Sequence, residues 1–451
     1  MTGPERFDSP RPAGPRDADD GAAVPSGRLS RFLAVGGLAG RVAGAAVAGG
    51  IGDIARLRRP NPADLLLSPA NARRIADELA RMRGAAMKVG QLMSMDAGDV
   101  LPPEIASILA RLRDDARPMP PKQLRDVLTA EWGAGWLKQF ASFDVRPIAS
   151  ASIGQVHKAE TRDGRKLAIK VQYPGVRDAV DSDVRNLAGL VRLSGMLPRG
   201  LDISPVIDEA RRQLLDETEY LREAEELARF GAFLKDDPGF RVPAPADDFS
   251  TRSVLAMEFI ESVPLDRLAE APQDVRDDVA GRLIALVLRE LFEFGAMQTD
   301  PNLANYRYER DTGRVVLLDF GAARTLPDPL VASFRQLMRA GLDSDWPAAE
   351  AAARDLAILH PDLPARHTEV LMGMFELAMA SIREDRPFDF GSSDLMHRLR
   401  DMGLQIGSER EFWTIPATDT ILVQRKVAGT YLMAARLKAR VNLHRIVRDF
   451  T

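Results

Sequence analysis

The apolar and polar positions divide the chain into a helical beginning, a strand-rich middle and a long helical end. In residues 70–97 apolar side chains recur at spacings of four and three, which places them along one side of a helix. Pro102-Pro103 ends this region, and Ser107–Arg113 and Pro121–Ala130 are predicted as further helices. The positions that form the apolar side of the first helix are Ile75, Leu79, Met82, Ala86, Val89 and Met93.

Around Phe143 the pattern changes to short runs of strand-forming residues. Ile148–His157 and Lys166–Gln172 are two such runs, and Asp163-Gly164 lies between them. An Asp-Gly pair between apolar runs is typical of a hairpin turn. The two runs are therefore predicted to pair as strands.

After this hairpin the pattern becomes mainly helical again. Residues 203–235 carry a long helical pattern, Arg252–Ile260 is a further strand candidate, and helices dominate from Val275 onward. The exception is Tyr306–Phe320, which is predicted as a hairpin with Asp311-Thr312-Gly313 as its turn. We find no internal repeat with a period of 20–50 residues.

This order of elements predicts an α+β fold with two lobes like those of protein kinases. An N-terminal helical extension precedes the lobes, and the C-terminal lobe is mostly helical. We place the extension at residues 31–142, the N-terminal lobe at 143–262 and the C-terminal lobe at 263–451. Residues 1–30 are rich in Pro, Gly, Asp and Arg and are predicted to be a disordered tail.

Composition excludes several classes of function. The 451 residues are 45% hydrophobic and 28% charged, as in an ordinary globular protein, and a net charge of -4 gives no sign of nucleic-acid binding. The absence of Cys excludes disulfides, Cys-based zinc sites and a Cys nucleophile, and it fits a reducing compartment. No run of about 18 uncharged apolar residues predicts a membrane span. The nearest candidate, Phe32–Ile54, contains Arg41.

Lys170 is the first candidate for chemistry. It stands among apolar residues in a predicted strand, Leu167-Ala168-Ile169-Lys170-Val171, with a glycine-containing hairpin before it and an acidic helix after it. In kinase-like sites such a lysine neutralises the α- and β-phosphates of ATP and is held by a helix glutamate. A strand lysine by itself is more often simply solvated, so its setting makes Lys170 a candidate.

Two further motifs have the spacing of a kinase active site. Leu317-Leu318-Asp319-Phe320-Gly321 resembles the junction that places a carboxylate on Mg²⁺. Asp300 and Asn305 lie five residues apart and 14 or more residues before Asp319, as the catalytic-loop Asp and Asn of kinases do. Each motif alone is explained by an ordinary turn. Their order after the Lys170 strand favours a nucleotide site.

With these motifs in place, the sequence resembles the UbiB/AarF family of atypical kinases, close to its mitochondrial and α-proteobacterial coenzyme Q branch, over residues 70–445. Its most specific motif is Lys88-Val89-Gly90-Gln91, which matches the KxGQ motif of that family. Ser150–His157 reads like the alanine-rich loop that replaces the glycine-rich loop of ordinary kinases. Glu217–Glu223 corresponds to the ExD motif and the glutamate after it, and Arg425–Gly429 matches near the C-terminus.

The resemblance implies roles for individual residues in binding ATP (or ADP) and Mg²⁺. Lys170 is expected to pair with Glu223 and to contact the phosphates of ATP. Asn305 and Asp319 are expected to hold Mg²⁺. Asp300 takes the place of the catalytic-loop aspartate.

The resemblance also implies how the rest of the nucleotide is covered. The helix that carries Lys88 folds over the cleft, where Lys88 meets Glu217 and excludes a large protein substrate. The backbone at Glu258, Phe259 and Ile260 contacts adenine. The alanine-rich loop lies over the nucleotide with four residues, Ala149, Ser150, Ala151 and Ser152.

Three features depart from familiar patterns. Glu219 replaces the Asp of the ExD motif, which keeps the carboxylate but extends its reach by one methylene. Gln298-Thr299 stands where protein kinases have His-Arg, and this argues against protein phosphorylation. Ala and Ser in Ala149–Ser152 restrict a backbone that glycine would leave free to approach phosphates. We therefore expect a nucleotide pose or preference different from that of kinases with a glycine-rich loop.

The function that the resemblance implies is that of an atypical kinase-like, Mg²⁺-dependent ATPase that supports ubiquinone (coenzyme Q) biosynthesis. It would act on lipid precursors or on the biosynthetic complex. Two alternatives stay open. One is a nucleotide-gated scaffold or chaperone with little turnover, and the other is a true protein kinase.

Expected partners besides ATP are lipid quinone precursors, an anionic membrane surface and a second copy of the chain, with no nucleic acid. We expect a cytoplasmic protein at the periphery of the inner membrane, with Phe32–Ile54 and residues 105–112 as candidate contact surfaces. His157 is interpreted as structural. A basic C-terminal helix is interpreted as a solvated face or, alternatively, a contact to anionic lipid. Its residues are Arg425, Lys426, Arg436, Lys438, Arg440, Arg445 and Arg448.

Overall fold

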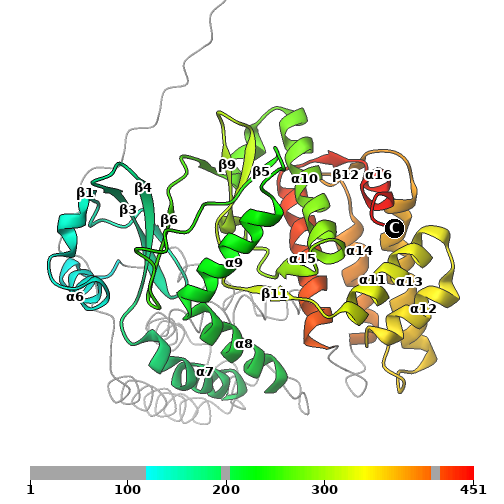
Figure 1. Ribbon diagram of the computed structural model, residues 1–451. Helices are drawn as coiled ribbons and strands as arrows, with labels where there is room; N and C mark the ends of the chain where they lie inside the picture. The colour runs from blue at the N-terminus through cyan, green and yellow to red at the C-terminus, as the bar shows by residue number, and fades with distance from the viewer. Residues whose placement is uncertain (1–117, 194–203, 408–416) are drawn as a thin grey trace, which may run out of the picture.

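The computed structural model describes residues 118–193, 204–407 and 417–451, and they form an α+β fold with two lobes. Figure 1 shows a smaller lobe built on a sheet and a larger lobe made mainly of helices. The predicted fold class is confirmed. The helices predicted at 70–97 and Ser107–Arg113 lie outside the described residues.

A five-stranded antiparallel sheet is the framework of the N-terminal lobe. Its strand order is β1-β3-β4-β6, and the short strand β2 pairs with the first residues of β3. In β4 every residue from Leu167 to Gln172 is buried, so Lys170 lies inside the lobe. The strands are β1 (Phe140–Phe143), β2 (Ala149–Ser150), β3 (Gly154–Thr161), β4 (Lys166–Gln172) and β6 (Val254–Glu258).

The predicted Asp-Gly hairpin is confirmed, because β3 and β4 pair antiparallel around it. Gly164 in its turn has a φ of 86°, a conformation that glycine adopts without steric cost. The prediction of one strand over Ile148–His157 was wrong. The amide of Ala151 donates to the carbonyl of Gly154 at 2.8 Å, so the chain folds back between β2 and β3.

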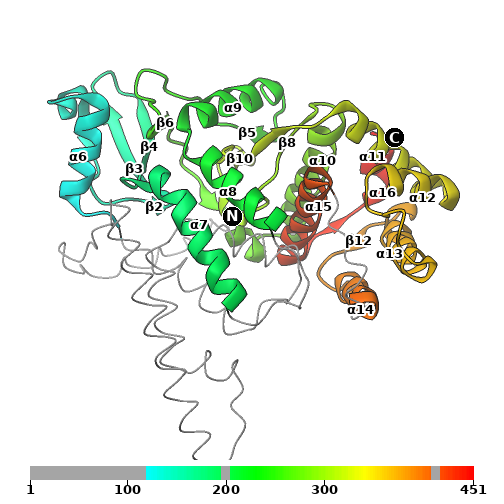
Figure 2. The ribbon, with the colours of Figure 1, turned by 90° about the horizontal axis from the view of Figure 1, so that it is seen from below.

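Four α-helices belong to the described part of this lobe. Helix α6 begins with Pro121, at a position where a missing N–H costs no helical hydrogen bond. Its Leu124 and Leu128 share a hydrophobic core with Trp136 and Ile169, so α6 packs with the sheet, while the limits proposed for the lobes stay a prediction. Helices α7 and α8 lie side by side (Figure 2). The four are α6 (Pro121–Trp132), α7 (Val176–Leu193), α8 (Ser204–Glu217) and α9 (Tyr220–Phe233).

The helical pattern across residues 203–235 forms two helices rather than one. Helix α8 ends at Glu217, and α9 begins at Tyr220. Between them the hydroxyl of Thr218 donates to the carbonyl of Leu215 at 2.7 Å, a local bond that competes with continuation of the helix. The break sets the direction of α9, whose first turn packs against β6.

The predicted hairpin at Tyr306–Phe320 is also confirmed. Strands β9 and β10 pair antiparallel, and Gly313 in the turn has a φ of 71°. They belong to a four-stranded sheet in the order β5-β10-β9-β7, and a separate two-stranded sheet pairs β8 with β11. These strands are β5 (Phe240–Arg241), β7 (Val263–Pro264), β8 (Ala296–Gln298), β9 (Tyr306–Glu309), β10 (Arg314–Leu317) and β11 (Ala323–Thr325).

The remainder of the C-terminal lobe is helical, apart from the short pair β12 (Phe388–Asp389) and β13 (Arg440–Val441). Helices α10 and α15 pack against each other beside the hairpin (Figure 1). None of the helices in the described ranges is long and apolar enough to cross a membrane. The helices are α10 (Gln273–Phe292), α11 (Asp328–Asp343), α12 (Trp346–Asp355), α13 (Ala365–Arg383), α14 (Leu395–Gly407), α15 (Thr418–Arg436) and α16 (Leu443–Arg448).

One hydrophobic core runs through both lobes. It joins Ala168 of β4 and Met257 of β6 to Leu283 of α10, Phe320 and Met433 of α15. The two lobes therefore pack against each other through this core.

Candidate active site

The candidate site begins with an ion pair inside the N-terminal lobe. Lys170 Nζ lies 2.8 Å and 2.9 Å from the two carboxylate oxygens of Glu223. Strand β4 supplies the lysine, and the first turn of α9 supplies the glutamate, which is 2% exposed. This pair is the contact that the sequence resemblance implied. It leaves the lysine charged and aimed at the junction of the lobes.

Asp319 lies next to this pair. Its Oδ2 is 3.4 Å from Lys170 Nζ, and its Oδ1 accepts the amide of Gly321 at 3.0 Å. Burial acts to lower the pKa of Lys170, but the charges of Asp319 and Glu223 outweigh it and raise the pKa well above its usual range. Lys170 is therefore a cation at neutral pH, beside two carboxylates.

The loop that carries Asp319 is anchored by two residues of helix α9. Phe320 is 1% exposed, and its ring lies 4.6 Å from that of Phe230 in α9. Arg222, also in α9, donates to the carbonyl of Gly321 at 2.6 Å. One helix thus holds Lys170 through Glu223 and the Asp319 loop through Arg222 and Phe230.

The segment Asp300–Asn305 forms a compact loop after β8. The side chain of Asn302 accepts the amide of Ala304 at 3.1 Å and caps the short 3₁₀ helix Leu303–Asn305. Asn305 Nδ2 lies 3.2 Å from the carbonyl of Asp300 and 3.4 Å from its Oδ2. Because the amide nitrogen faces Asp300, the amide oxygen of Asn305 is left as an acceptor.

Asn305 is tied to the Asp319 segment through the backbone. Its carbonyl accepts the amide of Leu318 at 3.0 Å. The structure thus brings Asp300, Asn305 and Asp319 to adjoining loops, although the β9–β10 hairpin separates Asn305 from Asp319 in the sequence. The roles assigned to these residues remain proposals.

Gln298 and Thr299, which stand in place of His-Arg, are both buried. The hydroxyl of Thr299 donates to the carbonyl of Ala322 at 2.8 Å, in continuation of the β8–β11 pairing. Gln298 Oε1 accepts a hydrogen bond from Lys426 of α15 at 3.3 Å. These two residues therefore connect the catalytic loop to the Asp319 loop and to the helical core.

The alanine-rich loop is tied to the ExD motif. Ala149 and Ser150 are exposed, and the hydroxyl of Ser152 donates to Glu217 Oε2 at 2.7 Å. Glu219, in place of the motif's Asp, points elsewhere, to Arg252 at 2.8 Å. Glu217 thus has a contact to the loop in this structure, whereas Lys88 lies outside the described residues.

The backbone predicted to contact adenine follows β6. The amide of Glu258 donates to the carbonyl of Ala244 at 2.8 Å, and that of Phe259 to Lys166 at 2.9 Å. In the described part of the chain the amide of Ile260 has no such acceptor. Of the three predicted residues, Ile260 is therefore the one whose N–H can serve a ligand.

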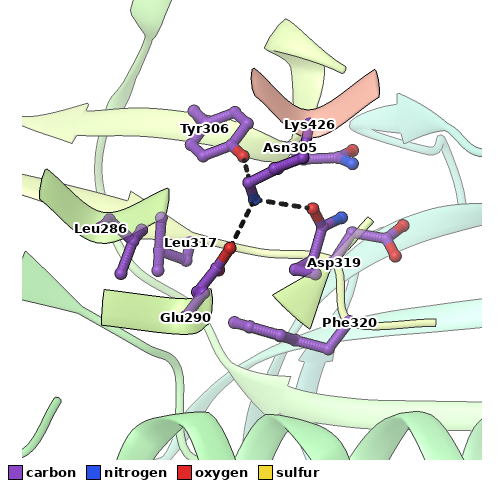
Figure 3. A pocket seen from close by; sticks show the side chains of 9 residues that line it. Leu286, Glu290, Asn305, Tyr306, Leu317, Asp319, Phe320 and Lys426 are labelled. Carbon is purple, nitrogen blue, oxygen red and sulfur yellow. Dashed lines mark hydrogen bonds and ion pairs between the residues drawn. The ribbon is translucent and has the colours of Figure 1, made fainter. Parts of the chain in front are cut away.

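The interpretation of the C-terminal basic residues as a solvated face was wrong for Arg425 and Lys426. The seven residues run from α15 to α16, and Arg425 and Lys426 are only 4% and 1% exposed, whereas the other five are exposed. Figure 3 shows Lys426 pointing to Glu290 and Tyr306 in a pocket that Asn305 and Asp319 also line. Arg425 forms an ion pair with Asp300. The physical reason is that carboxylates on neighbouring elements, Glu290 and Asp300, compensate both cations.

Sequence reasoning missed these two residues as part of the site, although a signal was present. The buried positions of α15 recur at helical spacing, and Arg425 and Lys426 occupy two of them, between Leu422 and Met433. A charged pair on the apolar side of a helix has to meet partners inside the protein. The position of the pair on the apolar side of the helix indicated burial, although its charge suggested a solvated surface.

The donor set fits ATP and Mg²⁺. Among the described residues no cluster of three or more His, Asp or Glu side chains forms a metal cage. Mg²⁺ does not require one, because it keeps waters and takes phosphate oxygens besides one or two protein ligands. The Asp319 carboxylate and the Asn305 amide oxygen would supply those ligands, and Lys170 would supply a cation for phosphate.

Comparison with known proteins gives the same picture. A model of the ABC1 atypical kinase-like domain matches residues 111–352. The atypical kinase COQ8, mitochondrial, of Saccharomyces cerevisiae is 35% identical over 439 residues, which covers 96% of this chain and 87% of the relative. COQ8B, mitochondrial, of Danio rerio is 36% identical over 441 residues, which covers 94% of this chain and 69% of the relative.

A solved structure shares the fold. The complex of Rv3197 with erythromycin from Mycobacterium tuberculosis superposes with a TM-score of 0.59 at 25% identity. The match covers 84% of this chain and 95% of that one.

The fold and the site define an atypical kinase, an enzyme that transfers a phosphoryl group from ATP. More particularly, the chain belongs to the ABC1 atypical kinase family, the UbiB/AarF type that the sequence resemblance indicated.

Proposed function

We propose that this protein is a Mg²⁺-dependent ATPase or lipid kinase that supports ubiquinone (coenzyme Q) biosynthesis. The observation that carries the catalytic part is the Lys170–Glu223 ion pair, set 3.4 Å from Asp319. The link to ubiquinone rests on the resemblance to COQ8 kinases over nearly the whole chain. Lipid precursors or the biosynthetic complex are the proposed targets.

In this proposal each charged group has a separate task. Lys170 binds the α- and β-phosphates, and Glu223 keeps its ammonium in place. Asp319 and Asn305 hold Mg²⁺, which supplies charge neutralisation of the phosphates when bound. Asp300 orients the attacking water or hydroxyl and accepts its proton.

The remaining contacts would hold the nucleotide in one pose. The Ile260 amide donates to adenine, and the carbonyl of Glu258 is the neighbouring acceptor, with Phe259 between them. Ala149–Ser152 cover the phosphates, and the Ser152–Glu217 hydrogen bond limits how far this loop can move. A restricted loop supports a nucleotide preference different from that of glycine-rich loops.

We also propose that the protein works at the periphery of the inner membrane, from the cytoplasmic side, where lipid precursors are accessible. An anionic surface and a second copy of the chain remain proposed partners. Hydrolysis of Mg·ATP should rise when liposomes containing cardiolipin are added and should stay unchanged with liposomes of neutral lipid. Equal rates with both kinds of liposome would remove the anionic surface from the proposal.

The biological role is tested in a strain that lacks the chromosomal gene. The wild-type chain should restore the ubiquinone content of such cells, and Asp319→Asn should not. Restoration by both chains would favour the second candidate, a nucleotide-gated scaffold with little turnover. Unchanged ubiquinone in the deletion strain would refute the pathway link.

A further inference from the structure

Two consecutive residues of α15 reach the catalytic loop from within the C-terminal lobe. The side chains of Arg425 and Lys426 are 1% and 2% exposed. The roles proposed for the nucleotide site use neither of them. Because an uncompensated buried charge is costly, the partners of each cation indicate what it is there to hold.

Lys426 contacts three polar partners. Its ammonium lies 3.1 Å from Glu290 Oε2, 3.1 Å from the hydroxyl of Tyr306 and 3.3 Å from Gln298 Oε1 (Figure 3). It donates hydrogen bonds to Tyr306 and Gln298, and its contact with Glu290 is an ion pair. Gln298 precedes the catalytic loop and Tyr306 follows it. Lys426 therefore fixes α15 to both ends of the loop and to α10.

Arg425 faces the loop itself. Its Nη2 lies 3.2 Å from Asp300 Oδ1, while Nε and Nη1 are buried without an acceptor in the described part of the chain. The other oxygen of Asp300, Oδ2, faces Asn305 Nδ2 at 3.4 Å. The two carboxylate oxygens are thus held by donors from two different elements, α15 and the loop.

A purely structural role explains Arg425 poorly. Each buried N–H without an acceptor costs desolvation energy, so most buried donors in proteins are satisfied. Arg425 instead leaves two donors without acceptors in the described ranges and directs Nη2 to Asp300. Burial of the two donors without acceptors is costly, and Nη2 contacts Asp300, the proposed catalytic carboxylate.

We propose that Arg425 is a positioning residue for phosphoryl transfer, which acts by fixing the carboxylate of Asp300, with Lys426 setting the register of α15 on the loop. The inference rests on the proposed role of Asp300. Arg425 also places a positive charge beside Asp300, which opposes repulsion between that carboxylate and the phosphates. It thereby supplies, from a distant helix, an arginine next to the catalytic aspartate where Gln298-Thr299 provides none.

The test compares Arg425→Met, Arg425→Lys and Arg436→Met in Mg²⁺-dependent ATP hydrolysis without lipid. Arg425→Met should lower kcat about 100-fold, the order expected when a reacting group is misplaced, and should leave KM for ATP and the Kd of Mg·ADP nearly unchanged. Arg425→Lys should recover part of the loss. Arg436, which is exposed at the other end of α15, should be replaceable without effect.

A kcat of wild-type size in Arg425→Met would overturn the proposal. So would a loss of nucleotide binding that matches the loss of kcat, because that is what a structural role predicts. If Arg425→Met does not fold, as judged by its melting temperature, Arg425→Gln replaces it and the same outcomes decide.

A double variant separates this inference from the function on which it rests. Once Asp300→Asn has removed the carboxylate, adding Arg425→Met should lower kcat no further, since residues that act as a unit are not additive. A second loss as large as the first would show that Arg425 acts independently of Asp300. If Asp300→Asn turns over ATP like the wild type, the role of Asp300 fails first, whatever Arg425 does.

Discussion

At the scale of single residues, the site is defined by charges that the fold removes from water. Lys170 and Glu223 make one buried pair, and Lys426 and Glu290 make another, with each side chain 10% exposed or less. Buried pairs contribute little net stability, but the loss of one partner leaves a charge that nothing compensates. The first pair faces the proposed phosphates, and the second supports the loop behind them.

Replacement of Lys426 by Met should destabilise the protein by about 3–5 kcal/mol, because Glu290 loses its counter-charge. The double variant Lys426→Met with Glu290→Leu should recover much of this loss, since it leaves no unpaired charge. Urea unfolding followed by circular dichroism measures both. A double variant as unstable as the single one would show that the ion pair is not the cause.

The same variant should depend on pH. Burial raises the pKa of Glu290 to about 6 in the folded protein, against an ordinary 4.5, even with Lys426 acting to lower it. Without Lys426 the folded pKa rises further. A carboxyl group whose folded pKa is raised stabilises the fold when protonated, and this stabilisation is lost as pH rises. The gap in unfolding free energy between wild type and Lys426→Met should therefore widen above about pH 6. A constant gap would contradict this.

The residues of the first pair were predictable, and those of the second were not. Lys170, Glu223 and Asp319 stand in motifs whose chemistry is readable from residue type and order. Lys426 stands in a run of basic residues, which most often form a solvated surface. Only its tertiary partner, Glu290 on another helix, gives the reason for its burial.

At the scale of elements, two short interruptions place the site. The break between α8 and α9 brings Glu223 to Lys170, and the turn between β2 and β3 brings Ser152 to Glu217. Periodicity alone predicted one long helix and one long strand here. The breaks depend on a local threonine hydrogen bond and on strand pairing, which apolar spacing does not encode.

Gly154 is the first residue of β3, directly after the turn between β2 and β3. The structure leaves no room for a side chain there. A Cβ there would lie 2.4 Å from the carbonyl oxygen of Val171 and 2.9 Å from the hydroxyl of Tyr220. Gly154→Ala should lower the free energy of unfolding by about 1–3 kcal/mol, the usual cost of overpacking, and should weaken nucleotide binding.

The matched control is Gly189→Ala in α7, where a Cβ would meet no atom of the described residues within 4 Å. Alanine in a helix interior is favoured over glycine by about 1 kcal/mol, so this variant should be as stable as the wild type or more stable. Thermal melting and binding of Mg·ADP compare the two. Equal stability of both variants would contradict the close approach at Gly154.

At the scale of the whole molecule, one core shared by both lobes holds the catalytic loop against the Lys170 strand. The lobe order, both hairpins and the helical end were predictable, because each has its own periodicity or turn chemistry. The packing of α15 onto the catalytic loop was not, since more than a hundred residues separate Arg425 from Asp300. Long-range pairings of this kind follow from the fold and not from local pattern.

The proposed cover over the cleft makes a prediction for the full chain. If the helix with Lys88 excludes protein substrates through Glu217, Lys88→Ala should gain autophosphorylation, measured as phosphate incorporated from labelled ATP. Lys122→Ala, at an exposed position of α6, should incorporate no more than the wild type. Lys88→Ala that also incorporates no more than the wild type would count against the cover.

The central claim is that the residues around Lys170 and Asp319 turn over ATP with Mg²⁺. The most direct measurement is the rate of ATP hydrolysis by the purified full-length protein, with and without Mg²⁺, for the wild type and Asp319→Asn. We predict hydrolysis that requires Mg²⁺ and falls at least about 100-fold in Asp319→Asn, while ADP binding without metal persists. Equal hydrolysis by both proteins, or none by the wild type, would contradict the claim.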